Sequence, residues 1–218
     1  MPRRAWELTM VALVLLGANA VEHRWTFEDT AVGERPRGWT ASQTGEGTGS
    51  VWKVTEDLTA PAGSKVLTQL SSEGPNRFFN VCTSDQPVLA DVDIVVSVKA
   101  LTGKLDQGGG PIWRFRDAKN YYICRLNPLE QDFRLFHVVD GVRTMIGEPA
   151  TVQAPVGKWH TIRVVQRGDH IQCWLNNTRH FNVHDKTLTA AGHVGVWTKA
   201  DAVTSFDDLR VRSPKAGD

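Results

Sequence analysis

The sequence predicts an all-β fold, an antiparallel β-sandwich, from three observations. Short runs rich in β-branched and aromatic residues recur along the chain, and such residues favour a half-buried pleated surface. Gly, Asn or Asp separates nearly every pair of runs, as in Asp140-Gly141 and Asn176-Asn177, which is the turn chemistry that joins strands. No window of useful length shows a sustained helical period. The clearest strands are expected at 92–100, 112–116, 121–127, 133–139, 160–166, 170–175, 193–198 and 205–211.

The first twenty residues are predicted to be a secretory signal peptide. Arg3 and Arg4 form a basic start, residues 10–16 are apolar, and Ala18 and Ala20 stand where a signal peptidase needs small residues. The apolar run is shorter than the roughly 20 residues that span a bilayer, so an uncleaved membrane anchor is the less favoured alternative. The protein is therefore expected to be secreted, into a periplasm or out of the cell.

Residues 21–218 are expected to form one domain, because no linker or internal repeat divides them and β-sandwiches often reach this size. Removal of residues 1–20 takes away two arginines and one glutamate and leaves equal numbers of basic and acidic side chains. A neutral chain exerts no long-range attraction on nucleic acid or anionic lipid, and no later segment is apolar enough to span a membrane. We expect a monomer with neither kind of partner.

The three cysteines are expected to be mostly structural. Cys124 and Cys173 lie in apolar, strand-like runs, where free cysteine commonly acts as a small buried hydrophobe. Cys82 could pair with either of them, and the sequence does not choose a connectivity. The chain has no Cys-x-x-Cys pattern, so neither a zinc site nor a redox motif is indicated.

The hairpin at 112–127 allows faces to be assigned. Residues 117–120 (DAKN) form a predicted tight turn, and side chains alternate across each strand. The expected core face carries Trp113, Phe115, Tyr122, Cys124 and Leu126. The opposite face is expected to carry Arg114, Arg116, Tyr121, Arg125 and Asn127. This second set is either a solvated face with ordinary ion pairs or a ligand-facing sheet, where planar donors meet sugar hydroxyls or a carboxylate.

Several segments resemble known sandwiches. GKWHTIRV (157–164), GDHI (168–171) and WLN (174–176) resemble a strand pair of concanavalin A-like and laminin-G-like domains. DQGGG (106–110), WRFRD (113–117), NYY (120–122), GVWTKAD (195–201) and FDDLRV (206–211) resemble secreted bacterial domains near the 3-keto-disaccharide hydrolase family. The resemblance covers roughly residues 21–213 and implies a concanavalin A-like jelly roll with its ligand on the concave sheet. One such fold hosts many chemistries, so the resemblance specifies fold better than function.

The same resemblance implies cleavage of glycosides oxidised at the third carbon of the sugar. That reaction abstracts a proton next to a ketone, eliminates the glycoside and hydrates the product, and it needs a base and a cation or metal for the enolate. Candidate bases are His137, Asp106 and Asp201, and candidate cations are Arg114, Arg125 and Lys199. No histidine and carboxylate set has a spacing that requires a metal.

Three further assignments concern other ligands. A retaining glucanase on this fold would carry Glu-x-Asp-x-x-Glu on one strand, and the nearest run, residues 91–96 (DVDIVV), has no acid where the proton donor should be. A structural Ca²⁺ could join the two chain ends through Asp29 and Asp207, with Glu28 and Asp208 beside them. The remaining assignment is of Trp39 and Trp52, which flank the loop 40–50 and are candidates for exposed sugar-stacking residues, whereas Trp113, Trp174 and Trp197 are expected in the core.

Three functions remain open. The first is a carbohydrate-binding sandwich that uses the arginine face with Trp39 or Trp52 at its rim. The second is a hydrolase or lyase acting on 3-keto-glycosides, and the third is an adhesion module of the laminin-G type. The absence of a paired acid favours binding, whereas a chain with a single domain favours an enzyme.

Overall fold

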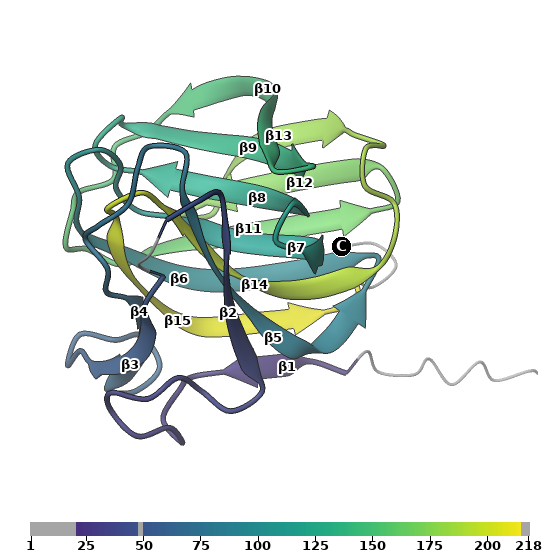
Figure 1. Cartoon of the computed structure of the whole chain (residues 1–218). Helices are drawn as coiled ribbons and strands as arrows, with labels where there is room; N and C mark the ends of the chain where they lie inside the picture. The colour runs from purple at the N-terminus through teal and green to yellow at the C-terminus, as the bar shows by residue number, and fades with distance from the viewer. Residues whose placement is uncertain (1–20, 48–49, 215–218) are drawn as a thin grey trace, which may run out of the picture.

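Residues 21–47 and 50–214 are described by the computed structural model, and every regular element within them is a β-strand. The strands form two antiparallel sheets packed face to face (Figure 1). Within these ranges no helix has the length and apolar character needed to cross a membrane. The predicted signal peptide, residues 1–20, lies outside the described residues.

Sheet A is the eight-stranded sheet, and its order is β13-β12-β11-β6-β15-β4-β3, with β1 also paired to β15. Its strands are β1 (His23–Trp25), β3 (Trp52–Glu56), β4 (Lys65–Gln69), β6 (Val92–Thr102), β11 (His160–Arg167), β12 (His170–Leu175), β13 (Thr178–His184) and β15 (Val203–Arg212).

Sheet B is the seven-stranded sheet, and its order is β10-β9-β8-β7-β14-β5-β2. Its strands are β2 (Trp39–Thr44), β5 (Phe79–Leu89), β7 (Gly110–Asp117), β8 (Asn120–Asn127), β9 (Asp132–Val139), β10 (Val142–Thr151) and β14 (Gly192–Lys199). Strands distant in sequence pair in the middle of each sheet, β6 with β15 and β7 with β14. This is the predicted antiparallel jelly-roll sandwich, and the predicted fold class is confirmed.

The main core lies between the sheets and follows the predicted alternation. Strand β6 contributes every second residue from Val92 to Val98 to this core. Strand β8 of sheet B contributes Tyr122, Cys124 and Leu126 to the same core. Burial of such side chains is the dominant favourable term in folding. All three cysteines are buried as free thiols, and burial together with the neighbouring Cys173 raises the pKa of Cys124.

The predicted faces of β7 are wrong for two residues. Asp117 pairs with Asn120 as expected, but Trp113 then pairs with Tyr122, so residues 114–116 bulge opposite a single residue. At this bulge Arg114 adopts a positive φ of 48°, and a bulge re-aims side chains. Phe115 consequently faces outward and packs on Tyr121, with ring centroids 5.6 Å apart.

Arg114 is therefore a buried structural residue rather than a member of the predicted ligand face. Its guanidinium donates to the carbonyl oxygens of Ala90 at 2.6 Å, Leu188 at 2.5 Å and Gly168 at 2.7 Å. It joins the β7 bulge to loops at the end of sheet A. Arg116, at the same hairpin, is exposed.

The tryptophan predictions also need correction. Trp39 and Trp52 are 4% and 3% exposed and belong to the main core, where Trp39 meets Phe27 and Trp52 meets Phe206. They are thus not exposed stacking residues, because each begins a strand whose first side chain points inward. Trp174 is only half-buried, and Trp197 belongs to a second apolar cluster outside the main core.

We predict that Arg114→Met destabilises the protein by about 3 kcal/mol, because three carbonyl oxygens, including that of buried Leu188, lose a charged donor. The matched variant Arg116→Met should change the free energy of unfolding by less than about 0.5 kcal/mol, as surface substitutions usually do. Urea unfolding of both variants measures the difference. Equal effects of the two substitutions would contradict the structural role of Arg114.

Candidate functional site on the outer face of sheet B

The outer face of sheet B carries a second apolar cluster, separate from the main core. On β8, Tyr121 and Ile123 point outward while Tyr122 and Cys124 point into the core. The cluster consists of Phe79, Val81, Ile112, Phe115, Tyr121, Ile123, Val138 and Trp197. All eight side chains are buried, so other parts of the chain must cover this face.

Strand β10, one edge of the sheet, supplies much of this cover. The Arg143 guanidinium lies over three rings, 4.3 Å from Phe136, 5.2 Å from Phe79 and 5.7 Å from Trp197. Four strands separate β10 from β5 in the sheet, which would place them about 24 Å apart if the sheet were flat. Arginine cannot bridge that distance, so the sheet must curl inward and the face is concave.

The opposite edge closes one end of this concave face. Thr44 on β2 donates to the carbonyl of Ala118, and its Oγ1 lies 2.6 Å from the Tyr121 Oη. The Gly141 N–H, at the turn between β9 and β10, donates to the Lys119 carbonyl at 3.0 Å. Both edges of sheet B thus meet over the β7–β8 turn.

A buried carboxylate, Asp106, organises the other end of the face. It accepts hydrogen bonds from Lys199 Nζ at 2.8 Å, Asn127 Nδ2 at 3.1 Å and Arg125 Nη1 at 3.3 Å. Burial raises the pKa of Asp106, and the positive charges of Arg125 and Lys199 oppose that rise. The loop before β7 and the ends of β8 and β14 are held together at this point.

Arg125 extends the cluster toward the β8–β9 turn. Its Nη2 lies 2.6 Å from Glu130 Oε2 and 2.7 Å from Asp132 Oδ1, and Arg134 lies 2.5 Å from Asp132. Burial would raise the pKa of Glu130, but the charge and hydrogen bond of Arg125, together with the charge of Arg134, lower that pKa below its usual value. Arg125, Arg134 and their carboxylates therefore neutralise one another.

Asp201 positions the loop that carries Asp106. Its carboxylate accepts from the backbone N–H groups of Lys104 at 2.6 Å, Leu105 at 3.0 Å and Asp106 at 3.1 Å. Burial tends to raise the pKa of Asp201, yet these three donors lower it below its usual value. Asp201 thus anchors the backbone of the loop that carries Asp106, through hydrogen bonds that it accepts from three backbone N–H groups.

A cavity of about 440 Å³ opens between the β9–β10 turn, the start of β5 and the end of β14. Its lining residues are Asn76, Arg77, Phe79, Gly141, Val142, Arg143 and Lys199. Lys199 belongs both to this lining and to the Asp106 cluster. The cavity is therefore connected to the buried ion pairs through one lysine.

The structure gathers part of the predicted site. Asp106, Arg125, Asn127 and Lys199 form one hydrogen-bonded cluster, and Asp201 fixes its loop. Their roles in ligand binding or catalysis stay predictions.

Two other predicted site residues stand apart from the cluster. Tyr121 is buried beneath the closed end of the face and bonded to Thr44. His137 stands on the core side of β9, with Nδ1 3.5 Å from Asp185 Oδ2 and its ring against Tyr122. It is separated by the sheet from Arg125.

Arg143, Phe79, Glu130 and Asp132 were not singled out from the sequence. The segment 142–151 (VRTMIGEPAT) shows little hydrophobic alternation, so nothing local indicated that Arg143 would reach across the sheet. Glu130 and Asp132 are the acids nearest in sequence to Arg125, which is the one signal that could have identified them.

The predicted calcium ligands Asp29 and Asp207 have different surroundings. Asp207 is fully buried and accepts from the N–H groups of Ala62 and Asp208, and burial raises its pKa. Asp29 is exposed and accepts a hydrogen bond from Thr30 Oγ1. Among the described residues no group of three or more His, Cys, Asp or Glu side chains is arranged to hold a metal ion, and the calcium site stays a prediction.

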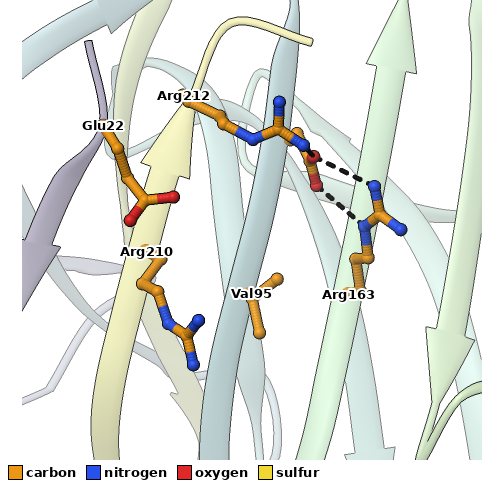
Figure 2. Close-up of a pocket in the computed structure, with 6 residues that line it drawn as sticks. Glu22, Val95, Arg163, Arg210 and Arg212 are labelled. Atoms are coloured by element: carbon orange, nitrogen blue, oxygen red, sulfur yellow. Dashed lines mark hydrogen bonds and ion pairs between the residues drawn. The ribbon is translucent and has the colours of Figure 1, made fainter. Parts of the chain in front are cut away.

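The outer face of sheet A carries a second cavity, of about 390 Å³, which is also rich in arginine (Figure 2). There Arg163 and Arg212 both bond to Asp93, and Arg210 bonds to Asp208 at 2.5 Å. The arginines of this face are thus paired with carboxylates of their own face.

We predict strong coupling between Asp106 and Lys199. Lys199→Met alone should destabilise the protein by about 3 kcal/mol, because it removes one partner of a buried ion pair. The double variant Asp106→Asn with Lys199→Met should be more stable than the sum of the single effects, by about 1 kcal/mol or more. A double-mutant cycle in urea measures this, and simple additivity would contradict the buried pair.

The sandwich is similar to solved carbohydrate-related structures. The carbohydrate-binding module CBM66 from Bacillus subtilis matches with a TM-score of 0.63 and 18% identity, covering 81% of this chain and 96% of that one. Cellulose induced protein, Cip1, matches with a TM-score of 0.60 and 16% identity, over 90% and 99% of the two chains.

A third similar structure is domain 4 of AbnA, an extracellular GH43 arabinanase from Geobacillus stearothermophilus, in complex with arabinotriose. It matches with a TM-score of 0.58 and 12% identity, over 90% of this chain and 94% of that domain. These identities show a shared fold. None of the curated proteins matches the chain significantly.

One family model matches nearly the whole described domain. It is the model of the 3-keto-alpha-glucoside-1,2-lyase-like domain, and it covers residues 27–212. The match begins at Phe27 and runs through strands of both sheets to the end of β15. The chain therefore belongs to the 3-keto-alpha-glucoside-1,2-lyase-like domain family.

Proposed function

We propose that the protein binds a carbohydrate in the cavity on the concave outer face of sheet B. The observation that carries this proposal is the curl of the sheet, which leaves a hollow of about 440 Å³ over a rigid, mutually bonded ion cluster. Ligand sites are typically preformed hollows of roughly 300–1,000 Å³ with a few fixed polar groups. This cavity has that size and that kind of lining.

A sugar in this cavity would meet donors more than ring faces. The Asn76 amide, the Arg77 and Arg143 guanidiniums and the Lys199 ammonium all line it, whereas Phe79 is only 5% exposed. Amide and guanidinium groups offer several N–H donors in fixed directions, and hydroxyl oxygens accept them. Recognition would accordingly depend on hydrogen bonds, with the buried rings supporting Arg143 from below.

The comparisons support a glycan ligand and an extracytoplasmic location. Two of the similar structures are named as a carbohydrate-binding module and as a domain of an extracellular arabinanase. We propose by analogy that residues 1–20 are removed as a signal peptide and that residues 21–218 act outside the cytoplasm as a single-domain monomer.

Calorimetric titration of residues 21–218 with a panel of oligosaccharides tests the binding function. We expect at least one glycan to bind, and Phe79→Ala, which removes the support of Arg143, to weaken it about tenfold or more. Such a loss corresponds to about 1.4 kcal/mol. Arg210→Gln, on the outer face of sheet A, is the control and should bind normally. Binding that survives Phe79→Ala but fails in Arg210→Gln would assign the ligand to sheet A.

A second candidate function, elimination from 3-keto-glycosides, is favoured by the family membership. The reaction needs a base for the proton beside the ketone and a cation for the enolate oxygen. Lys199 lines the cavity and bonds to Asp106 directly behind it. Burial raises the pKa of Asp106 against the opposing charges of Arg125 and Lys199, and because Asp106 does not line the cavity, it would accept the proton through Lys199.

The test of this activity is release of free sugar from a 3-keto-disaccharide, with and without a chelator. If the site is an eliminase, Lys199→Met and Asp106→Asn should each lower kcat about a hundredfold or more, the usual range for loss of a proton-transfer group. Arg210→Gln should leave the rate unchanged. A rate that is insensitive to both site substitutions would exclude elimination at this cluster and leave binding as the function.

A further inference from the structure

The cavity on sheet B has an excess of positive charge. Three of its lining residues are the cations Arg77, Arg143 and Lys199, and the other four, Asn76, Phe79, Gly141 and Val142, carry no charge. Lys199 shares its charge with Asp106. The two arginines, Arg77 and Arg143, are therefore the groups that would attract a negatively charged ligand.

Arg143 has no acidic partner within the described residues. Its neighbours are the rings of Phe79, Phe136 and Trp197, and its Nη1 is buried with no hydrogen-bond partner. The nearby carboxylates are already in ion pairs with other cations: Asp106 with Lys199 and Arg125, and Glu130 with Arg125. A planar fork of donors with an unused buried N–H is suited to a bidentate acceptor.

The surroundings of Arg143 also disfavour its own charge. Burial, reinforced by the positive charge of Arg125, lowers the pKa of Arg143 to about 10. The arginines on sheet A differ, because Arg212 bonds to Asp93 (Figure 2) and Arg210 bonds to Asp208. An anion placed in the sheet B cavity would supply the compensation that the sheet A arginines already have.

We propose that the cavity receives the carboxylate of an acidic sugar, a uronate residue of the bound glycan, with Arg143 as its principal partner and Arg77 beside it. This inference rests on the proposed binding function and names its ligand class. A hollow of about 440 Å³ is far larger than a lone inorganic anion requires. Asn76 and Phe79 also line the cavity and would contact the rest of the sugar ring.

The test compares acidic oligosaccharides with their methyl esters, which keep the same sugars and linkages but lack the charge. The panel contains oligomers of galacturonate, mannuronate and glucuronate, titrated by calorimetry into residues 21–218. We expect an acid to bind about tenfold or more tighter than its ester, since hydrogen bonds to a charged acceptor are stronger than those to a neutral one. The difference should shrink between about 0.01 M and about 1 M salt, because ions screen the exposed part of the interaction.

Two variants assign this preference to the cavity. Arg143→Gln should weaken binding of the acid far more than binding of the ester, so that the acid is no longer preferred. Arg77→Gln, at an exposed position, should reduce the difference in affinity between acid and ester without affecting the fold. This second variant keeps the test decisive if Arg143→Gln is unstable. Arg210→Gln is the matched control on sheet A and should keep the full preference.

The outcomes separate this inference from the function on which it rests. Equal affinity for acid and ester, with both weakened by Phe79→Ala, would overturn the acidic ligand and leave glycan binding in place. Failure of every acidic and neutral glycan to bind would overturn both. Inorganic phosphate that binds as tightly as the uronate, and that loses its affinity in Arg143→Gln, would show a small-anion site and overturn the acidic sugar.

Discussion

The contact on which the candidate site depends is that of Arg143 with the rings of Phe79, Phe136 and Trp197. These residues come from four different strands of sheet B, and they meet only because the sheet curls. A guanidinium over an aromatic face is favourable by about 0.5–2 kcal/mol, and here it also covers an apolar cluster that would otherwise face water. The curl of sheet B thus both stabilises its outer face and creates the cavity.

Much of the fold follows from local alternation in the sequence. The inward residues of β6 and β8 were predictable because strands separate buried from exposed side chains at every second position. The bulge at Arg114 broke that rule, since a positive φ at an arginine depends on three carbonyl partners from loops distant in sequence. Trp39 and Trp52 were misplaced because β2 and β3 are short and largely polar, so no local pattern marked them as strands.

The site was predictable where it lies within one hairpin and unpredictable where it crosses the sheet. Arg125 and Asn127 share a strand, and alternation placed both on the face opposite the core. Arg143 depends on β5 and β14, whose positions beside it are set by the strand order and the curl. His137 was ambiguous because both alternating sets of 133–139 are partly apolar. The register of β8 and β9 pairs it with Tyr122 on the core side, where it also lies near Asp185.

Membership of the lyase-like domain family and a concave cationic cavity bear on one central claim, that sheet B binds an acidic sugar at Arg143. A crystal structure of residues 21–218 with a bound uronate oligosaccharide tests it most directly. The account predicts a sugar carboxylate within hydrogen-bond distance of the Arg143 guanidinium, with Asn76 and Lys199 near the same ring. A sugar seated instead on the outer face of sheet A, in the cavity between Arg163 and Arg210, would contradict it.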